Sequence, residues 1–216
     1  MGSKITKFKN NLWYLVFWPV YIVTFVGLER LMDGRTFHLV HCFIDDLIPF
    51  NELFVIPYLS WHVLIPLTLY YTLIYETDNF RNLMKYFILT FVVTMVIYLV
   101  YPTYLNLRPE TFERDNILTW IVGFVYTVDT PTNVCPSLHI IGSLGLLFAS
   151  WDTRGRGSRV RQAIMIILVI FICLSTMFMK QHSFIDVLTA LPVSFVGWII
   201  CFRGKEMEKF NEEHQW

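Results

Sequence analysis

Residues 161–202 read RQAIMIILVIFICLSTMFMKQHSFIDVLTALPVSFVGWIICF, in which two apolar runs meet at the polar string KQHSFID of residues 180–186. Each run has roughly the 20 predominantly apolar residues that a helix needs to cross a bilayer. Ionisable side chains at the mouth of a membrane span are costly and mark a functional site by default. The stretch therefore predicts two membrane helices joined by a polar turn that is itself a candidate site.

The whole chain shares this apolar character. Hydrophobic residues make up 55% of its 216 residues and charged residues only 16%, which is more apolar than a soluble domain of this size. We therefore expect an all-α, polytopic membrane protein, with one membrane domain over residues 1–216 and its catalytic motifs within residues 101–186. The formal net charge is zero, so bulk charge indicates no nucleic-acid partner.

Six apolar runs fit membrane spans and predict a six-transmembrane-helix bundle. They cover residues 12–31, 53–75, 83–104, 136–151, 161–179 and 183–202, and the fourth is short for a full crossing. The first run follows three lysines, as in a signal peptide, but it is long and lacks a small-residue cleavage site. We therefore expect it to persist as the first span.

The distribution of basic residues predicts the orientation of this bundle. If both termini are cytoplasmic, the inner segments hold twelve of the seventeen Lys and Arg residues, and the outer segments keep Arg30, Arg35, Arg108, Arg114 and Lys180. This asymmetry follows the positive-inside rule. We expect a plasma-membrane protein whose site faces outside, with an organelle membrane and a lumenal site as the alternative.

Two long segments, residues 32–52 and 105–135, fall on the outer side of this topology. The first mixes charged and apolar side chains, which predicts an amphipathic segment in the membrane interface. Its charged side chains are open to two interpretations, a solvated face or a lipid gate or metal site. We favour the solvated face, because the spacing of His38, His41, Asp45 and Asp46 forms no strong ligand set.

The four cysteines, Cys42, Cys135, Cys173 and Cys201, show no CxxC spacing. This pattern argues against a metal site and against a disulfide framework. We interpret the cysteines as small apolar filler, with a Cys42–Cys135 pair as the less favoured alternative.

The string PSLH of residues 136–139 opens the fourth predicted span. Proline suits the first position of a helix, and free backbone N–H groups at a helix start bind anions. Ser137 would add its hydroxyl there, and His139 would follow one turn later. The competing interpretation is that the string only starts the helix and that His139 reaches toward the interface.

His182 and Asp186 are four residues apart, which places them on one face of a helix. A carboxylate that binds one imidazole nitrogen fixes the tautomer and makes the other nitrogen a better nucleophile or base. A purely structural His–Asp pair is the alternative. Arg108 and Lys180, two of the few outer cations, would suit phosphate oxygens.

In this order and spacing, the three strings resemble the motifs of the type 2 phosphatidic acid phosphatase superfamily, which read KxxxxxxRP, PSGH and SRxxxxxHxxxD. The resemblance covers roughly residues 50–200. The matching residues are Arg108-Pro109, then Pro136, Ser137 and His139, then Ser175, His182 and Asp186. The departures are Tyr101 for the first-motif Lys, Leu138 for Gly and Thr176 for Arg. The Pro-Ser-Leu-His form is similar to the branch that contains inositol-phosphorylceramide synthase-like proteins.

The resemblance implies a role for each matched residue. His182 would attack phosphorus and form a phosphohistidine, with Asp186 orienting it and His139 protonating the leaving oxygen. The phosphate oxygens would be held by Arg108, Lys180 and Ser137. Pocket-shaping roles are expected for Asn133, Asp129 and Tyr101, although Asp129 and Asn133 also lie in a good turn sequence.

The expected activity is that of a membrane lipid-phosphate phosphatase that hydrolyses a lipid mono- or diphosphate without a metal or other cofactor. Its partners would be the lipid substrate and the bilayer. Because Tyr101, Leu138 and Thr176 depart from the motifs, a phosphotransferase that passes a phospho-headgroup to a lipid alcohol is the alternative. A second alternative is a non-catalytic protein that binds or transports an anionic lipid. The oligomeric state stays open.

Overall fold

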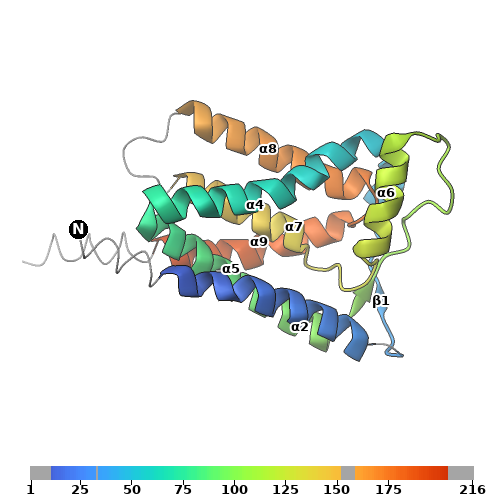
Figure 1. The fold of residues 1–216 in the computed structure, drawn as a ribbon. Helices are drawn as coiled ribbons and strands as arrows, with labels where there is room; N and C mark the ends of the chain where they lie inside the picture. Colours follow the sequence, from blue (N-terminus) through green and yellow to red (C-terminus); the bar gives the residue numbers. More distant parts are fainter. Residues whose placement is uncertain (1–10, 33, 152–158, 204–216) are drawn as a thin grey trace, which may run out of the picture.

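Long apolar helices make up most of the molecule (Figure 1). The computed structural model describes residues 11–32, 34–151 and 159–203, so both chain termini lie outside the described residues. The long helices are α2 (Phe17–Leu31), α4 (Val55–Tyr75), α5 (Thr77–Val100), α8 (Arg159–Phe178) and α9 (Phe184–Trp198). Short turns extend three of them, namely η1 (Trp13–Val16), η2 (Glu52–Phe54) and the π-helical η3 (Ile199–Arg203).

Five helical segments have the length and apolar composition of membrane spans. Within the described residues they are Trp13–Leu31, Glu52–Tyr75, Thr77–Val100, Arg159–Phe178 and Phe184–Arg203. These segments confirm the predicted mostly helical, membrane-protein character. The predicted third span, residues 83–104, was wrong at both ends. The helix begins earlier, at Thr77, with polar residues in its first turn. It ends at Val100, because Pro102 disfavours a helical conformation in the residue before it.

The predicted fourth span corresponds to a short central helix, α7 (Leu138–Trp151). Its 14 residues give a length of about 21 Å, compared with about 30 Å for the hydrocarbon core of a bilayer. Most of α7 is buried, and it contacts α4, α5, α8 and α9. The residues that begin α7 are therefore held inside the bundle by the longer helices around it.

Tyr86 of α5 fixes α7 and α9 against each other. Its hydroxyl donates to the carbonyl oxygen of Ile141 at 2.9 Å. A Cβ added at Gly145 or Gly197 would come within 2.5 Å of Tyr86 or Thr90, so glycine at both positions allows the ring to lie between the helices. The starts of α7 and α9 lie next to each other as well, because the N–H of Ser137 donates to the carbonyl oxygen of Asp186 at 3.2 Å.

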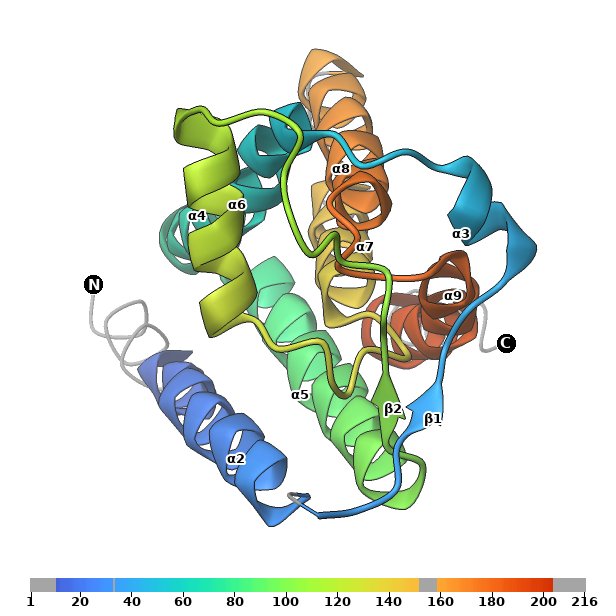
Figure 2. The same ribbon diagram turned by 90° about the vertical axis from the view of Figure 1, so that its right-hand side faces the viewer.

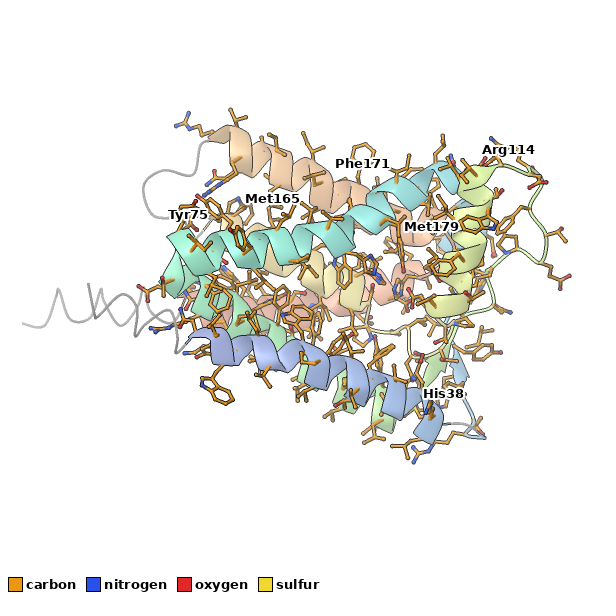
Figure 3. The ribbon with its side chains drawn as sticks, in the orientation of Figure 1. His38, Tyr75, Arg114, Met165, Phe171 and Met179 are labelled. Carbon is orange, nitrogen blue, oxygen red and sulfur yellow. The ribbon has the colours of Figure 1, made fainter. Side chains whose placement is uncertain are left out.

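The end of the bundle that carries these helix starts is covered by irregular chain and small elements (Figure 2). Helix α6 (Ile117–Val128) lies across this end, within the stretch that the sequence predicted as a loop. Strands β1 (His38–Leu39) and β2 (Thr103–Tyr104) pair in parallel, and α3 (Phe43–Leu47) follows β1. In Figure 3, His38, Arg114 and Met179 lie toward this end and Tyr75 lies toward the other.

Candidate active site

The turn between α8 and α9 holds His182 in a fixed position. The backbone N–H groups of Gln181 and His182 both donate to the carbonyl oxygen of Thr176, at 2.9 and 3.0 Å. Lys180 adopts a left-handed conformation, with φ of 56°, as residues at helix C-termini often do. Ser183 caps α9 by accepting from Ile185 N–H. The polar string of residues 180–186 is therefore a helix end, one tight turn and a helix start.

A chain of two histidines and a carboxylate joins the starts of α7 and α9. The Oδ2 atom of Asp186 is 3.1 Å from His182 Nδ1 and also accepts from Ser183 N–H at 2.9 Å. His182 Nε2 is 3.2 Å from His139 Nδ1. All three side chains are buried. The structure thus brings together the three residues that the sequence predicted as catalytic.

This chain has a defined direction. An ionised carboxylate only accepts hydrogen bonds, so His182 donates from Nδ1 to Asp186. A neutral imidazole that donates from Nδ1 carries a lone pair on Nε2. His182 Nε2 therefore accepts a hydrogen bond, and His139 Nδ1 is its donor. The arrangement supplies a nucleophilic nitrogen facing a proton donor.

Ser137 makes hydrogen bonds within the fold and does not face the cavity. It is fully buried, its N–H donates to the carbonyl oxygen of Asp186 at 3.2 Å, and its Oγ is 3.4 Å from the N–H of Ile140. Tyr98 of α5 donates to the carbonyl oxygen of Pro136 at 2.6 Å. These contacts anchor the start of α7, and Ser137 does not line the cavity described below.

Aromatic side chains of α4 enclose His139. The ring centroids of Trp61 and Tyr58 lie 4.6 and 4.8 Å from that of His139. A Cβ at Gly142 would come within 2.9 Å of the Trp61 ring, so this glycine lets the indole stay against α7. Asp129 Oδ2 accepts a hydrogen bond from the Tyr58 hydroxyl and lies 4.0 Å from His139 Nε2.

A cavity of about 990 Å³ opens beside the two histidines. Its walls are mainly apolar and aromatic side chains of α2, α4 and α6, with Tyr98 of α5 and the start of α7 completing them. Its polar end is lined by Asp129, Thr130, Thr132, Asn133, His62, His139, Gln181 and His182. Concave sites with an apolar lining and a few convergent polar groups are typical of ligand pockets.

Two amide side chains at this polar end have hydrogen-bonding atoms without partners. Asn133 is 3% exposed and Gln181 is 2% exposed. Within the described residues, neither side-chain atom of Asn133 has a partner, and Gln181 Nε2 has none. Leaving a buried polar group unpaired costs about 1–3 kcal/mol. Such groups in a native fold call for an explanation, and a bound polar ligand is one.

Arg108 lies behind the cavity wall. Its Nη1 donates to the carbonyl oxygen of Tyr126 at 3.0 Å and its Nη2 to that of Asp129 at 2.5 Å. Nη2 also bonds Gln181 Oε1. Burial lowers the pKa of Arg108, and the nearby charge of Asp129 opposes this shift. The guanidinium therefore holds Gln181 in place, and it does not line the cavity.

Lys180 contacts the interfacial segment instead of the cavity. Its Nζ donates to the carbonyl oxygens of Asp45 and Ile48, at 2.7 and 2.5 Å. Burial lowers the pKa of Lys180, and the carboxylates of Asp45 and Asp46 oppose this shift. The structure thus gives Lys180 other partners than the phosphate oxygens expected from the sequence.

Asp45 also joins the interfacial segment to the start of α9, through its carboxylate. The sequence favoured a solvated position for Asp45, and this was wrong, because it is 2% exposed. Its carboxylate accepts from Ser183 Oγ at 2.6 Å and from Phe184 N–H at 2.8 Å, at the start of α9. Burial would raise the pKa of Asp45, but hydrogen bonds from Ser183, Phe184 and Cys42 outweigh it and lower the pKa.

Tyr101 is not brought to the site. It is 53% exposed, its ring stacks on His38 at a centroid distance of 4.0 Å, and it does not line the cavity. Thr176, at the position of the third-motif Arg, is fully buried and donates to the carbonyl oxygen of Cys173. Among the described residues, no Lys or Arg side chain lines the cavity.

Four residues at or beside the site escaped the sequence argument. Gln181 is next to His182 in the polar string, and this position was the one sequence feature that could have indicated a place at the site. Tyr58 and Trp61 lie in an apolar run that looked like lipid-facing helix, and Asp45 looked like one charge among several. Tyr58, Trp61 and Asp45 are far from the two histidines in the sequence, and the fold brings them to the site.

The described residues form neither a metal-binding cluster nor a disulfide bond. In the part of the chain that the structure describes, no group of three or more His, Cys, Asp or Glu side chains is arranged to hold a metal ion. Cys42 and Cys135 are free thiols, as are the other two cysteines.

Comparison with protein-family models, curated proteins and solved structures gave no match.

Proposed function

We propose that this protein is a membrane lipid-phosphate phosphatase that works through a phosphohistidine. One observation carries the proposal: the Asp186–His182–His139 chain lies at the polar end of an otherwise apolar cavity. The apolar part suits a lipid tail, and the histidines suit chemistry on the group at its polar end. The resemblance to the phosphatidic acid phosphatase superfamily supports the same assignment.

In the first step, the Nε2 lone pair of His182 forms a bond to phosphorus as the bond from phosphorus to the leaving oxygen breaks. His139 enters this step as an imidazolium, gives one proton to that oxygen and becomes neutral, so the leaving group departs as a neutral alcohol or as a less charged phosphate. Asp186 holds Nδ1–H and stabilises the positive charge that develops on His182. In the second step, water attacks phosphorus, its proton passes to His139, and the nitrogen–phosphorus bond breaks.

The proposed membrane topology has six spans, with α7 as the short fourth span and both termini in the cytoplasm. The positive-inside rule supports this orientation, because it leaves twelve of the seventeen Lys and Arg residues of the sequence in the inner segments. The site then faces the outer side of the plasma membrane or the lumen of an organelle. The cavity between α2, α4 and α6 would admit a lipid tail from the bilayer.

The test is phosphate release by the detergent-purified protein from a panel of lipid mono- and diphosphates. We expect release without added metal, and trapping of an acid-labile, base-stable phosphohistidine. The matched variants are His182→Ala and His41→Ala, because His41 is an exposed histidine at the same end that binds Asp46. Unchanged turnover in His182→Ala would exclude the mechanism. A protein that binds lipid but is never phosphorylated would be a binding or transport protein.

A second candidate, a phosphotransferase, is favoured by the absence of Lys and Arg from the cavity lining among the described residues. A phosphomonoester carries up to two negative charges and a phosphodiester one, so a cavity poor in cations suits the diester of a phospholipid donor better. In this reaction a lipid alcohol replaces water in the second step. Supplying a phospholipid donor with a lipid alcohol separates the two functions, since a new phospholipid forms only by transfer.

A further inference from the structure

Asn133 lines the polar end of the cavity, and its backbone is held in place by hydrogen bonds. Its N–H donates to the carbonyl oxygen of Thr103 at 2.6 Å, and Thr103 Oγ1 accepts from the next two N–H groups, at 3.1 and 3.2 Å. The residue has a φ of 54°, a left-handed conformation that asparagine and glycine tolerate best. Strand β2 thus fixes the backbone of Asn133, while its side chain has no partner among the described residues.

The unpaired atoms of Asn133 define what the missing ligand must offer. One atom of the amide donates and the other accepts, and this holds whichever way the amide group is turned. An ionised phosphate oxygen only accepts, so it would leave the amide oxygen unpaired. An ammonium group only donates, so it would leave the amide N–H₂ unpaired. A hydroxyl group both donates and accepts and satisfies both atoms.

Gln181 supplies the complementary contact. Arg108 occupies its Oε1, which leaves Nε2 as a group that can only donate, with the Tyr58 hydroxyl beside the same amide. Gln181 precedes His182 in the chain, and both line the polar end of the cavity. A phosphate or ester oxygen next to the reacting phosphorus is an acceptor of this kind. The two amides therefore differ in the ligand group that each can bind.

The geometry points to a substrate that carries a free hydroxyl close to its phosphate, with Asn133 as the residue that selects for it. This inference rests on the proposed function and narrows its substrate class to hydroxyl-bearing lipid phosphates. Gln181 binds an oxygen on phosphorus, Asn133 exchanges two hydrogen bonds with the hydroxyl, and the tail occupies the apolar part of the cavity. A polar site built to bind a hydroxyl rejects an analogue that lacks it, because its own polar atoms stay unpaired.

The experiment compares two synthetic lipids that differ only in the hydroxyl. One is 1-oleoyl-glycerol 3-phosphate, and the other is its 2-O-methyl ether, which keeps the oxygen as an acceptor but removes the donor. We expect the intact protein to prefer the hydroxyl compound by at least about tenfold in kcat/KM. Asn133→Gly keeps the left-handed backbone and removes the amide, so this preference should fall to near one.

Two further variants complete the design. Asn133→Asp retains an acceptor for the hydroxyl proton and should keep a preference, whereas Asn106→Gly, a change at an exposed asparagine outside the cavity lining, should leave it intact. Equal turnover of both lipids by the intact protein would overturn the inference and leave the proposed function standing. So would an Asn133→Gly variant that slows both lipids equally. Absence of phosphate release and of phosphohistidine with either lipid would overturn both.

Discussion

The start of α9 and the polar end of the cavity are neighbours, yet their polar groups are satisfied in different ways. At the start of α9, Asp45 accepts from Ser183 and Phe184, and Lys180 donates to two carbonyl oxygens, while Asp186 Oδ1 alone keeps no described partner there. At the cavity end, the buried amides of Asn133 and Gln181 keep unpaired atoms. The first region holds His182 through protein contacts, and in the proposed function the second region meets the ligand.

The proposed mechanism requires His182 to be both buried and reactive, and this contrast is compatible with that requirement. A catalytic side chain needs a supporting shell that fixes its rotamer and leaves one face free. The α9 side supplies that shell through Asp186 and Ser183. In the proposed mechanism, phosphorus would approach the face toward His139, where the only described partner of His182 Nε2 is another imidazole.

The largest expected effect comes from breaking the link between the two histidines. His139→Asn keeps a donor near the position of Nδ1 but has no acidic proton, so kcat should fall by about 10²–10⁴ for a lipid phosphate with a poor leaving group. A nitrophenyl phosphodiester or monoester with a good leaving group should lose much less. Steady-state kinetics on both substrates measure the effect, with His41→Asn as the control. Equal losses for both leaving groups would remove the acid role.

Arg108 supports the cavity end through Gln181, and Arg108→Lys tests whether this is its role. Lysine cannot bind the carbonyl oxygens of Tyr126 and Asp129 and the Gln181 amide in the planar geometry that arginine provides. We expect kcat/KM to fall by about ten- to a hundredfold, because each hydrogen bond to a charged group contributes about 1.5–3 kcal/mol. If Arg108 acts by holding Gln181, the effects of Arg108→Lys and Gln181→Met will be less than additive. Fully additive losses would instead support separate contacts to phosphate.

Asp45→Asn should weaken the hydrogen bonds that hold the start of α9. The variant loses the charge that accepts from Ser183 and Phe184, so the free energy of unfolding in detergent should fall by about 1.5–3 kcal/mol. Asp46→Asn is the matched control, since Asp46 has an exposed carboxylate, and it should change stability by less than about 0.5 kcal/mol. Activity should fall together with stability in Asp45→Asn, because the same contacts position His182.

The pH dependence of this effect has a fixed sign. The pKa of Asp45 is lowered below its ordinary value of 3.8 in the folded protein. The stabilisation by its ionised form is therefore complete above pH 3.8 and is lost as the pH falls through the folded-state pKa. The gap in melting temperature between the protein and Asp45→Asn should narrow below pH 3.8. A gap that widens there would contradict the assigned contacts.

The sequence predicted the helices and the His182–Asp186 pair because both leave local signals. Apolar runs of span length mark helices, and the i, i+4 spacing of His182 and Asp186 marks one face of a helix. Counting spans put His139 and His182 on the same side, but it did not predict their hydrogen bond. The central position of α7 was not predictable in this way, because a mostly apolar run of 14 residues has the same composition whether lipid or protein surrounds it.

The partners of the charged side chains could not be predicted, because they depend on contacts between distant segments. Lys180 and Asp45 are far apart in sequence and meet only after the interfacial segment folds onto α9. The roles of Asn133 and Gln181 depend on which buried atoms stay unpaired, and a sequence does not contain that information. Motif matching could place a residue near the site, but it could not decide whether its side chain faces the cavity.

The smallest expected effect is at Tyr101, which marks the outer boundary of the site. Tyr101→Lys restores the cation of the first motif, yet the position is half exposed and stacks on His38 outside the cavity lining. We expect kcat/KM to change by no more than about twofold, as for surface substitutions in general. His38→Ala, which removes the stacking partner, is the control and should behave alike. A tenfold gain in Tyr101→Lys would show that this segment moves to the phosphate during turnover, and the boundary between the two regions would then have to include it.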